Sequence, residues 1–353
     1  MDNNKQHKHT KPVKQMDYLY FIEYEDYAPI MCADQDFMSF MGCSSIRNGN
    51  FYGRNLDLYY GNTPEFVVHI KGSYKRYESI SVCANPLITN NVEQMSEKEI
   101  SELPNIANDG INVNGVLISE NVVLPYGVDD KSGTNPGKEK IYAPYVTRYI
   151  LDHAESADHA IELLNDLDIV GGFKQYSLHW MIADENNTYI AEIINDKLVV
   201  SKNRYMYMTN FYLNMDDVKN IQSIAGRTFE NIPQLNRNPI GVERWCQIRD
   251  NYESTGSVKG MMNLLQEVKA TSTYYNSFYT EFTNEKLTEA SSLKEFKEEY
   301  KLQCELYKNR DRDNPNGCWI SWHSSVYDIK KRELYICVQE DYNHQLTYKL
   351  KFF

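Results

Sequence analysis

Three residues that could act together on an amide bond lie in one short segment of the chain: Cys43, Arg54 and Asp57. The dipeptide Asn48-Gly49 divides this segment, and Asn-Gly readily adopts the positive φ angles of a tight hairpin turn. We therefore expect a strand that begins at Cys43, a turn, and a second strand that returns Arg54 and Asp57 beside the thiol.

The chemistry that these residues suggest is that of an N-terminal nucleophile. Cleavage between Gly42 and Cys43 would give Cys43 both a thiol nucleophile and a free α-amino group, whose ordinary pKa of about 7.7 to 8.0 suits a general base. Gly42 lacks a Cβ atom, so the thiol can approach the preceding carbonyl and move its acyl group from nitrogen to sulfur. Arg54 would favour the thiolate, and Asp57 would accept hydrogen bonds from the ammonium group. The alternative is structural, because a free cysteine is commonly a small buried apolar residue.

Further segments agree with this chemistry when they are taken in order along the chain. They are residues 43–46 (CSSI), 53–57 (GRNLD), 109–118, 176–184, 207–210, 241–245 and 322–328. In sequence and order they resemble the choloylglycine hydrolase family of linear amide C–N hydrolases, which includes bile salt hydrolases and penicillin V acylases. That family is related to acid ceramidase and N-acylethanolamine amidase. The resemblance spans nearly everything from Cys43 to the C-terminus, and the order of the segments carries it.

The resemblance implies roles for six residues of this chain. Cys43 matches the nucleophile, Arg54 and Asp57 match the family's arginine and aspartate, Asn210 matches an oxyanion-holding asparagine, and Arg244 matches a late active-site arginine. The family's first oxyanion asparagine falls near Asn121, with the alignment shifted by about one residue. Two alternatives stay open: Asn210 could cap a local turn, and Arg227 or Arg249 could take the place of Arg244.

The resemblance also implies a fold, which is an α+β, four-layer αββα sandwich of two antiparallel sheets, as in N-terminal-nucleophile (Ntn) hydrolases. It implies no metal and no organic cofactor, and it makes a homo-oligomer, a dimer or tetramer, a reasonable expectation. Two departures from the family are visible. The hairpin between Cys43 and Arg54 is short, and residues 1–42 precede the cysteine, so exposure of its amine requires an internal cut.

The expected organisation follows from that cut. Residues 1–42 are expected to be an N-terminal extension that serves as a propeptide, and residues 43–353 the Ntn-hydrolase domain. Residues 1–16 are polar and rich in His and Lys, whereas residues 18–24 alternate enough to form a strand. The alternative is that this strand stays permanently at a sheet edge and is never released.

Composition agrees with a soluble enzyme but does not identify one. The chain has 353 residues, of which 42% are hydrophobic and 24% charged, and this is ordinary for a soluble globular protein. Its net charge of −12 argues against a nucleic-acid partner, because phosphate backbones are bound by clustered Lys and Arg. The seven cysteines show no Cys-x-x-Cys spacing, which favours reduced thiols and a cytoplasmic location. No segment before Cys43 is apolar enough for a signal peptide, and no membrane span is expected.

Hydrophobic periodicity predicts strand blocks alternating with helix blocks. Alternating residues predict strands at 176–183, 188–194, 197–201, 318–326 and 333–338. Helices are expected from Pro144, after the N-cap Ser156, and over 258–268, where a stripe of Val, Met and Leu indicates core packing. Such a pattern fits packed sheets covered by helices.

Three functions remain open from the sequence. The leading one is hydrolysis of a linear, non-peptide amide of an N-acyl small molecule, such as a conjugated bile salt, penicillin V or a fatty acyl amide. The second keeps the same thioester but passes the acyl group to another amine, as an acyltransferase. The third is a catalytically silent relative that binds a ligand.

Overall fold

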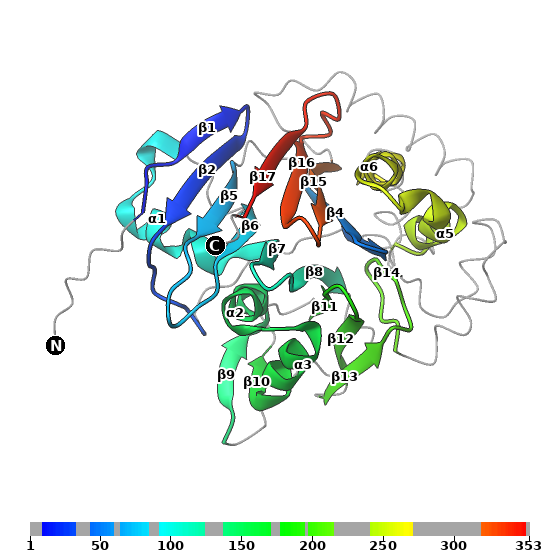
Figure 1. Ribbon diagram of the computed structural model, residues 1–353, viewed down its shortest axis with the longest axis horizontal. Helices are drawn as coiled ribbons and strands as arrows, with labels where there is room; N and C mark the ends of the chain where they lie inside the picture. Colours follow the sequence, from blue (N-terminus) through cyan, green and yellow to red (C-terminus); the bar gives the residue numbers. More distant parts are fainter. Residues whose placement is uncertain are drawn as a thin grey trace, which may run out of the picture.

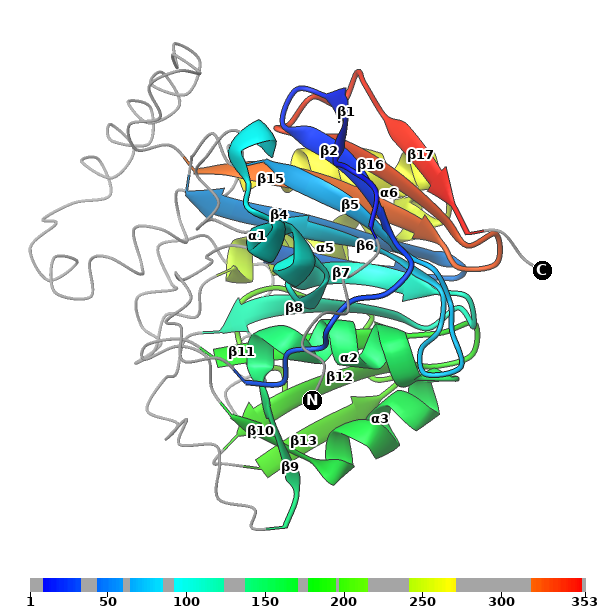
Figure 2. The same ribbon diagram turned by 90° about the vertical axis from the view of Figure 1, so that its left-hand side faces the viewer.

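The structure is a computed structural model that describes residues 9–32, 43–59, 64–84, 92–123, 137–170, 177–194, 197–214, 241–270 and 319–350. Within these ranges two large sheets face each other, and helices cover the outer face of each (Figures 1 and 2). This is the expected α+β arrangement of four layers. No helix within these ranges has the length and apolarity needed to cross a bilayer.

The first sheet, called sheet A below, has nine strands within the described ranges. In spatial order they are β1 (Val13–Met16), β2 (Leu19–Tyr24), β5 (Glu65–Ile70), β6 (Ser79–Ala84), β7 (Ala107–Asn112), β8 (Leu117–Val123), β11 (Ser177–Ala183), β12 (Thr188–Ile194) and β13 (Lys197–Lys202). All neighbours are antiparallel except β2 and β5, which run parallel. The sheet is therefore antiparallel, as expected, apart from the pair that brings in the N-terminal segment.

The second sheet, called sheet B, has six described strands, and every paired neighbour is antiparallel. In spatial order they are β14 (Tyr207–Met208), β3 (Cys43–Asn48), β4 (Phe51–Tyr59), β15 (Trp319–Asp328), β16 (Glu333–Val338) and β17 (Leu346–Lys349). A small parallel pair joins β9 (Glu139–Tyr142) and β10 (Leu167–Val170).

Helices pack on the outer faces of both sheets, as Figure 2 shows for α2, α3, α5 and α6. The helices are α1 (Glu97–Glu102), α2 (Val146–His153), α3 (Ala157–Asp166), α5 (Val242–Asn251) and α6 (Val258–Glu267), with short 3₁₀ turns η1 (Val92–Gln94), η2 (Leu103–Asn105), η3 (Ala143–Tyr145) and η5 (Tyr252–Thr255). Ser156 caps α3 as predicted, because its hydroxyl accepts a hydrogen bond from the His159 N–H. Pro144 does not begin a helix as expected but is the second residue of the turn η3, and α2 begins at Val146.

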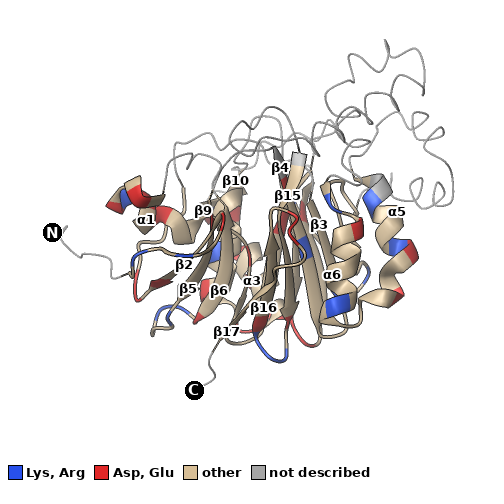
Figure 3. Cartoon of the chain, turned by 90° about the horizontal axis from the view of Figure 1, so that it is seen from above, with Lys and Arg blue, Asp and Glu red and all other residues tan. Residues whose placement is uncertain are grey.

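The apolar core follows these layers. One cluster fills the space between the sheets and includes Tyr52, Val67, Leu117 and Met181. A second lies between sheet B and α6, where Met261 is fully buried, so the predicted methionine stripe is core packing. Charged residues of both signs lie on the described helices α1 and α5, whereas the central strands are largely uncharged (Figure 3). The few charges inside the sandwich are therefore exceptional.

The hairpin that carries the cysteine has the predicted form. β3 and β4 pair so that Cys43 lies opposite Leu56 and Ser45 opposite Arg54, and Gly49 in the turn has a φ of 56°. This register brings Arg54 back towards the thiol. Gly42 and residues 1–8 lie outside the described residues.

The N-terminal segment contributes to the core of the described protein. Leu19, Ile22 and Tyr24 of β2 have no exposed surface, and Tyr27 is 1% exposed. The hydroxyl of Tyr24 donates to the Ile100 carbonyl at 2.5 Å, and that of Tyr27 donates to the Asp152 carboxylate. The strand expected at 18–24 is therefore present, and it is inserted between β1 and β5 of sheet A.

Candidate active site

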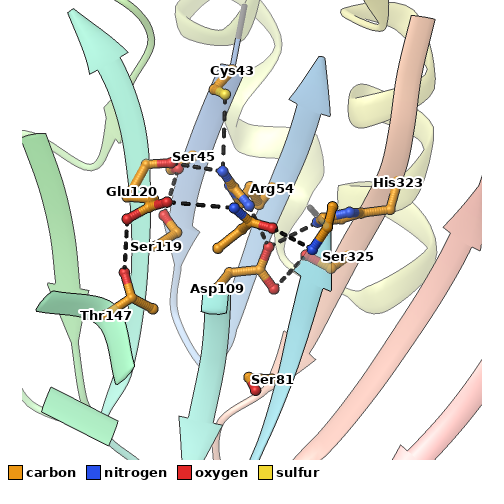
Figure 4. Close-up of polar contacts among 12 residues, drawn as sticks. Cys43, Ser45, Arg54, Ser81, Asp109, Ser119, Glu120, Thr147, His323 and Ser325 are labelled. Atoms are coloured by element: carbon orange, nitrogen blue, oxygen red, sulfur yellow. Dashed lines mark hydrogen bonds and ion pairs between the residues drawn. The ribbon is translucent and has the colours of Figure 1, made fainter. Parts of the chain in front are cut away.

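Cys43 is the first residue of β3 and is 1% exposed. Its side chain shares a strand face with that of Ser45, because strand residues alternate between faces, and the Ser45 hydroxyl lies 2.7 Å from the Ser119 hydroxyl of sheet A. The thiol therefore belongs to the space between the two sheets. Within that space Arg54 Nη2 lies 3.9 Å from Cys43 Sγ (Figure 4).

Arg54 is held on both sides of its guanidinium group. Nη1 donates to Asp109 Oδ2 at 2.7 Å, and Nη2 donates to the backbone carbonyl of Glu120 at 2.7 Å. Arg54 and Asp109 have 1% and 0% exposed side chains, so this ion pair is shielded from water. The group that faces the thiol is thus fixed in place by sheet A.

Asp57 approaches from the other face of β4, because it lies three positions after Arg54 and strand residues alternate between faces. Its carboxylate forms an ion pair with Arg244 Nη1 of α5 and accepts a hydrogen bond from Ser321 Oγ of β15 at 2.5 Å. Burial raises the pKa of Asp57 to about 6, although the charge of Arg244 acts in the opposite direction. The two residues of the expected Arg-x-x-Asp pair therefore lie on opposite faces of β4, the strand next to the one that carries Cys43.

A β-bulge in β15 places polar side chains of this strand on both faces of sheet B. Ser321 lies opposite Asp57 and His323 opposite Leu56, so Trp322 is an extra residue in the ladder. Ser321 consequently reaches Asp57 on the helix side of sheet B. His323, two residues later, reaches sheet A on the other side, where it meets Glu65 and Asp109.

Asn210 holds the backbone nitrogen of the cysteine. Its Oδ1 accepts a hydrogen bond from the Cys43 N–H at 2.9 Å and another from Arg244 Nη2 at 2.5 Å. Its Nδ2 donates to the Val122 carbonyl at 2.8 Å. The carboxamide is thus oriented by three groups, and it connects Arg244 to the residue expected to be the nucleophile.

Arg244 reaches this position because of how α5 begins. Gly241, the N-cap residue, has a φ of 82°, and a Cβ atom there would lie 2.8 Å from Thr209 Oγ1. The Thr209 hydroxyl donates to the Gly241 carbonyl at 3.0 Å. The start of the helix is therefore pressed against the segment that carries Asn210.

Asn121 lies behind that segment. Its Nδ2 donates to the Thr209 carbonyl at 3.1 Å, and its Oδ1 accepts a hydrogen bond from Ser45 Oγ at 3.0 Å. These contacts connect β8 to β3 and to the residue before Asn210. Of the six residues expected from the sequence, five meet around the Cys43 backbone and thiol, and Asn121 supports them from the side.

Burial raises the pKa of the Cys43 thiol above its ordinary value, while Arg54 opposes the shift and Asp57 adds to it. The thiol is therefore protonated at neutral pH in the uncut chain. A nucleophile of this kind needs a base within reach.

Several residues of this site were not singled out from the sequence. Asp109 and His323 lie in segments that carried the family resemblance, but neither was given a role, and Ser321 was not considered. Of the competing arginines, Arg249 pairs with Asp250 on the side of α5, and Arg227 lies outside the described residues. His179 is a buried structural residue that bonds Glu192 and the Thr209 carbonyl.

The chain was compared with protein families and with solved structures. The family model of linear amide C–N hydrolases, choloylglycine hydrolase family, matches residues 43–248. A solved mutant of conjugated bile acid hydrolase from Clostridium perfringens aligns with a TM-score of 0.50 and 16% identity, over 88% of this chain and 92% of the other. Penicillin V acylase from Agrobacterium tumefaciens aligns with a TM-score of 0.48 and 13% identity, over 84% and 82% of the two chains.

No curated protein sequence matches the chain. The family model nevertheless covers more than half of the 353 residues and begins at the cysteine itself. The bile acid hydrolase comparison supports the fold. The chain therefore belongs to the choloylglycine hydrolase family of linear amide C–N hydrolases.

Proposed function

We propose that this protein is a cysteine N-terminal-nucleophile hydrolase. It cleaves a linear, non-peptide amide bond of an N-acyl small molecule after autocatalytic cleavage between Gly42 and Cys43. The observation that carries the proposal is the position of Cys43, whose sulfur lies 3.9 Å from Arg54 Nη2 and whose nitrogen lies 2.9 Å from Asn210 Oδ1. Both reactive atoms of the residue thus have a polar partner inside the segment that the family model matches.

The maturation step uses the thiol on its own chain. Cys43 Sγ attacks the carbonyl carbon of Gly42, the C–N bond breaks as the C–S bond forms, and the thiol proton passes to the departing nitrogen, which becomes the free α-amine. Water then hydrolyses the thioester, which releases the carboxylate of Gly42 and restores the thiol. Asn210 Oδ1 accepts a hydrogen bond from the N–H of the scissile amide, so this nitrogen is already oriented before the bond breaks. The raised pKa of the thiol in the uncut chain explains why a new base is useful after cleavage.

Turnover then follows the same chemistry on a substrate amide. The α-amine takes the thiol proton as sulfur adds to the substrate carbonyl, and that proton passes to the leaving amine when the C–N bond breaks. Water adds to the thioester, the α-amine accepts its proton, and the C–S bond breaks to release the carboxylic acid. The thiol and the amine are regenerated, and no electrons are exchanged.

Asn210 and Arg244 stabilise the charge that forms on the substrate oxygen. An amide nitrogen carries two hydrogens, and one of those on Asn210 is used by the Val122 carbonyl. The second hydrogen is the one we assign to the oxyanion, with Arg244 fixing the carboxamide through Oδ1. Asn121 keeps this segment in position through the Thr209 carbonyl. Asp57, held by Arg244, balances the ammonium group of the mature cysteine.

The test uses two cysteine variants and intact mass under denaturing conditions. The wild type is expected to give a chain that begins at Cys43 and to hydrolyse at least one member of a panel of conjugated bile salts, penicillin V and fatty acyl amides. Cys43→Ser is expected to slow or block maturation, and Cys43→Ala to abolish cleavage and turnover. Normal turnover by the alanine variant would overturn the mechanism. A wild-type chain that stays uncut and inactive would favour the ligand-binding relative.

The same assay separates hydrolysis from acyl transfer. When a second amine is added, a hydrolase releases mainly the free acid, whereas an acyltransferase produces a new amide. All five described cysteines are free thiols, which fits the cytoplasmic location that we propose. We also propose a homo-oligomer, a dimer or tetramer, which light scattering on a sizing column tests.

A further inference from the structure

A line of four ionisable side chains crosses the sandwich behind Cys43. Glu65 on β5 and Asp109 on β7 come from sheet A, while His323 on β15 and Arg54 on β4 come from sheet B. His323 Nδ1 lies 2.7 Å from Glu65 Oε2, His323 Nε2 lies 2.9 Å from Asp109 Oδ2, and Arg54 Nη1 lies 2.7 Å from the same Asp109 oxygen. We call Glu65, His323, Asp109 and Arg54 the ion-pair chain.

The partners of His323 determine its charge. Both ring nitrogens face a carboxylate, and an ionised carboxylate only accepts hydrogen bonds. Both nitrogens must therefore donate, which requires the doubly protonated imidazolium form. Burial acts against that charge, but Glu65 and Asp109 raise the pKa of His323 to about 9. The charges along the chain then alternate: negative, positive, negative, positive.

Asp109 is the member that connects the histidine to the active site. Besides Arg54 and His323, it accepts a hydrogen bond from the hydroxyl of Ser325 at 3.4 Å (Figure 4). It also accepts one from the hydroxyl of Tyr327. Burial alone would raise the pKa of Asp109, but His323 and Arg54 lower it to about 2. The aspartate is thus a fixed, fully ionised anchor for the guanidinium group.

Stability alone does not account for four buried charges. Apolar residues of similar volume in place of a buried ion pair are often as stabilising or more so, and a cluster of apolar side chains fills much of the space between the sheets. The ion-pair chain ends at Arg54, whose Nη2 lies 3.9 Å from the sulfur of Cys43. The position of the ion-pair chain therefore indicates a function at the thiol of Cys43.

We propose that His323 is a positioning residue for the cysteine nucleophile: held by Glu65, it fixes Asp109, which in turn holds Arg54 against the sulfur of Cys43. This inference rests on the proposed function, in which the sulfur of Cys43 is the nucleophile. His323 touches no reacting atom itself. Removing its charge loosens Arg54 and weakens the stabilisation of the thiolate.

The experiment compares His323→Gln and Glu65→Gln with a matched control, His69→Gln. His69 lies on β5, on the same strand face as Glu65, and likewise sits between two carboxylates, those of Glu23 at 3.0 Å and Glu78 at 2.8 Å. No contact connects it to Arg54 within the described residues. The readout is the rate of iodoacetamide alkylation of Cys43 against pH, followed by peptide mass spectrometry, with all variants in the same cleavage state.

His323→Gln and Glu65→Gln are expected to raise the pKa of the Cys43 thiol and to slow its alkylation at pH 7 by about tenfold. The reason is that Arg54 would be held less firmly against the thiol, and an opposite charge near a titrating group is worth about one to three pKa units. In turnover, kcat should fall with KM nearly unchanged. His69→Gln should match the wild type. An unchanged titration in folded His323→Gln and Glu65→Gln, or an equal shift in His69→Gln, would overturn the proposal.

Two features keep the outcome decisive. Alkylation needs no substrate, so a wild type that hydrolyses no amide would defeat the proposed function and still leave the thiol comparison in force. If neither variant folds, ¹⁵N NMR of the histidine-labelled wild type decides. A His323 ring that is doubly protonated at pH 8 supports the proposal, and a neutral ring at pH 7 overturns it.

Discussion

Different side chains at this site contact different atoms of Cys43. Arg54 faces the sulfur of Cys43 from the space between the sheets, and Asn210 faces its nitrogen. Asp57 and Arg244 form a buried ion pair whose arginine also orients Asn210. Because each group has a separate contact, single substitutions should separate effects on the reacting carbonyl from effects on protonation.

Asn210 is the residue whose loss should act most directly on turnover. Asn210→Ala removes the proposed oxyanion donor and is expected to lower kcat by about a hundredfold to a thousandfold. Asn121→Ala is the matched comparison, because its carboxamide bonds Ser45 and the Thr209 carbonyl. Its main expected effect is a loss of about 1–3 kcal/mol in the free energy of unfolding. Steady-state kinetics with urea titration measures both, and equal kcat losses would contradict the assignment.

Removing Arg244 should reveal the cost of a buried, unpaired carboxylate. Arg244→Met leaves Asp57 with the Ser321 hydroxyl and is expected to lower the free energy of unfolding by about 3–5 kcal/mol. Arg244 holds the pKa of Asp57 down, so its removal should raise that pKa above about 6 and move any acid loss of activity to higher pH. Urea titration and a pH profile of residual kcat/KM report the two effects.

The double variant Asp57→Asn with Arg244→Met is the control for that experiment. It removes both charges, and it should regain part of the stability without regaining activity. If the double variant were no more stable than Arg244→Met, the lost stability would not come from the unpaired carboxylate.

Local pattern in the sequence could identify only part of this site. Cys43, Arg54 and Asp57 lie on one hairpin, so a turn signal at Asn48-Gly49 was enough to bring them together. The partners of those residues are remote in sequence: 55 positions separate Arg54 from Asp109, and 264 separate Asp57 from Ser321. The first contact depends on how the two sheets stack, and the second depends on the pairing of β4 with β15 within sheet B, neither of which residue spacing encodes.

Strands and helices were predictable where one periodicity dominated. The strands Thr188–Ile194 and Glu333–Val338 have the predicted bounds, and the helix Val258–Glu267 has the predicted apolar stripe. The bulge at Trp322 was not predictable, because an extra residue in a ladder leaves no signature in an alternating pattern. The parallel pairing of β2 with β5 likewise depends on tertiary packing.

The start of α5 offers a test of how an element positions a side chain. Gly241→Ala places a Cβ 2.8 Å from Thr209 Oγ1 and 2.9 Å from Thr209 Cβ, at a φ of 82° that alanine rarely adopts. We expect a loss of about 1–3 kcal/mol in stability and a drop in kcat, because the helix carries Arg244 away from Asn210. Thermal unfolding and kinetics measure the two effects.

Gly256→Ala is the matched control for that change. Gly256 has a φ of −71°, and its added Cβ would meet nothing within 4 Å. It should therefore leave both stability and kcat close to those of the wild type. A Gly241→Ala enzyme that also behaved like the wild type would show that the glycine does not place Arg244.

The molecule as a whole depends on residues that precede the proposed cleavage site. β2 lies inside sheet A between β1 and β5, with Leu19, Ile22 and Tyr24 fully buried. Burial of one such side chain contributes about 1.5–3 kcal/mol, and the backbone ladder to β5 adds to it. We infer that residues 1–42 behave as a propeptide that is cut but retained.

The last prediction concerns that retained chain. The mature wild type should show two chains in denaturing mass spectrometry and a single complex in native mass spectrometry, with N-terminal sequencing giving Cys43 and a second N-terminus upstream of β2. Ile22→Ala opens a cavity in the interface and costs about 2–5 kcal/mol, so it should release the N-terminal chain more readily after cleavage. Val13→Ala is the control, because Val13 on β1 is 53% exposed. An active wild type whose native complex lacks residues 1–42 would contradict retention, because it would show that β5 stays folded without β2 beside it.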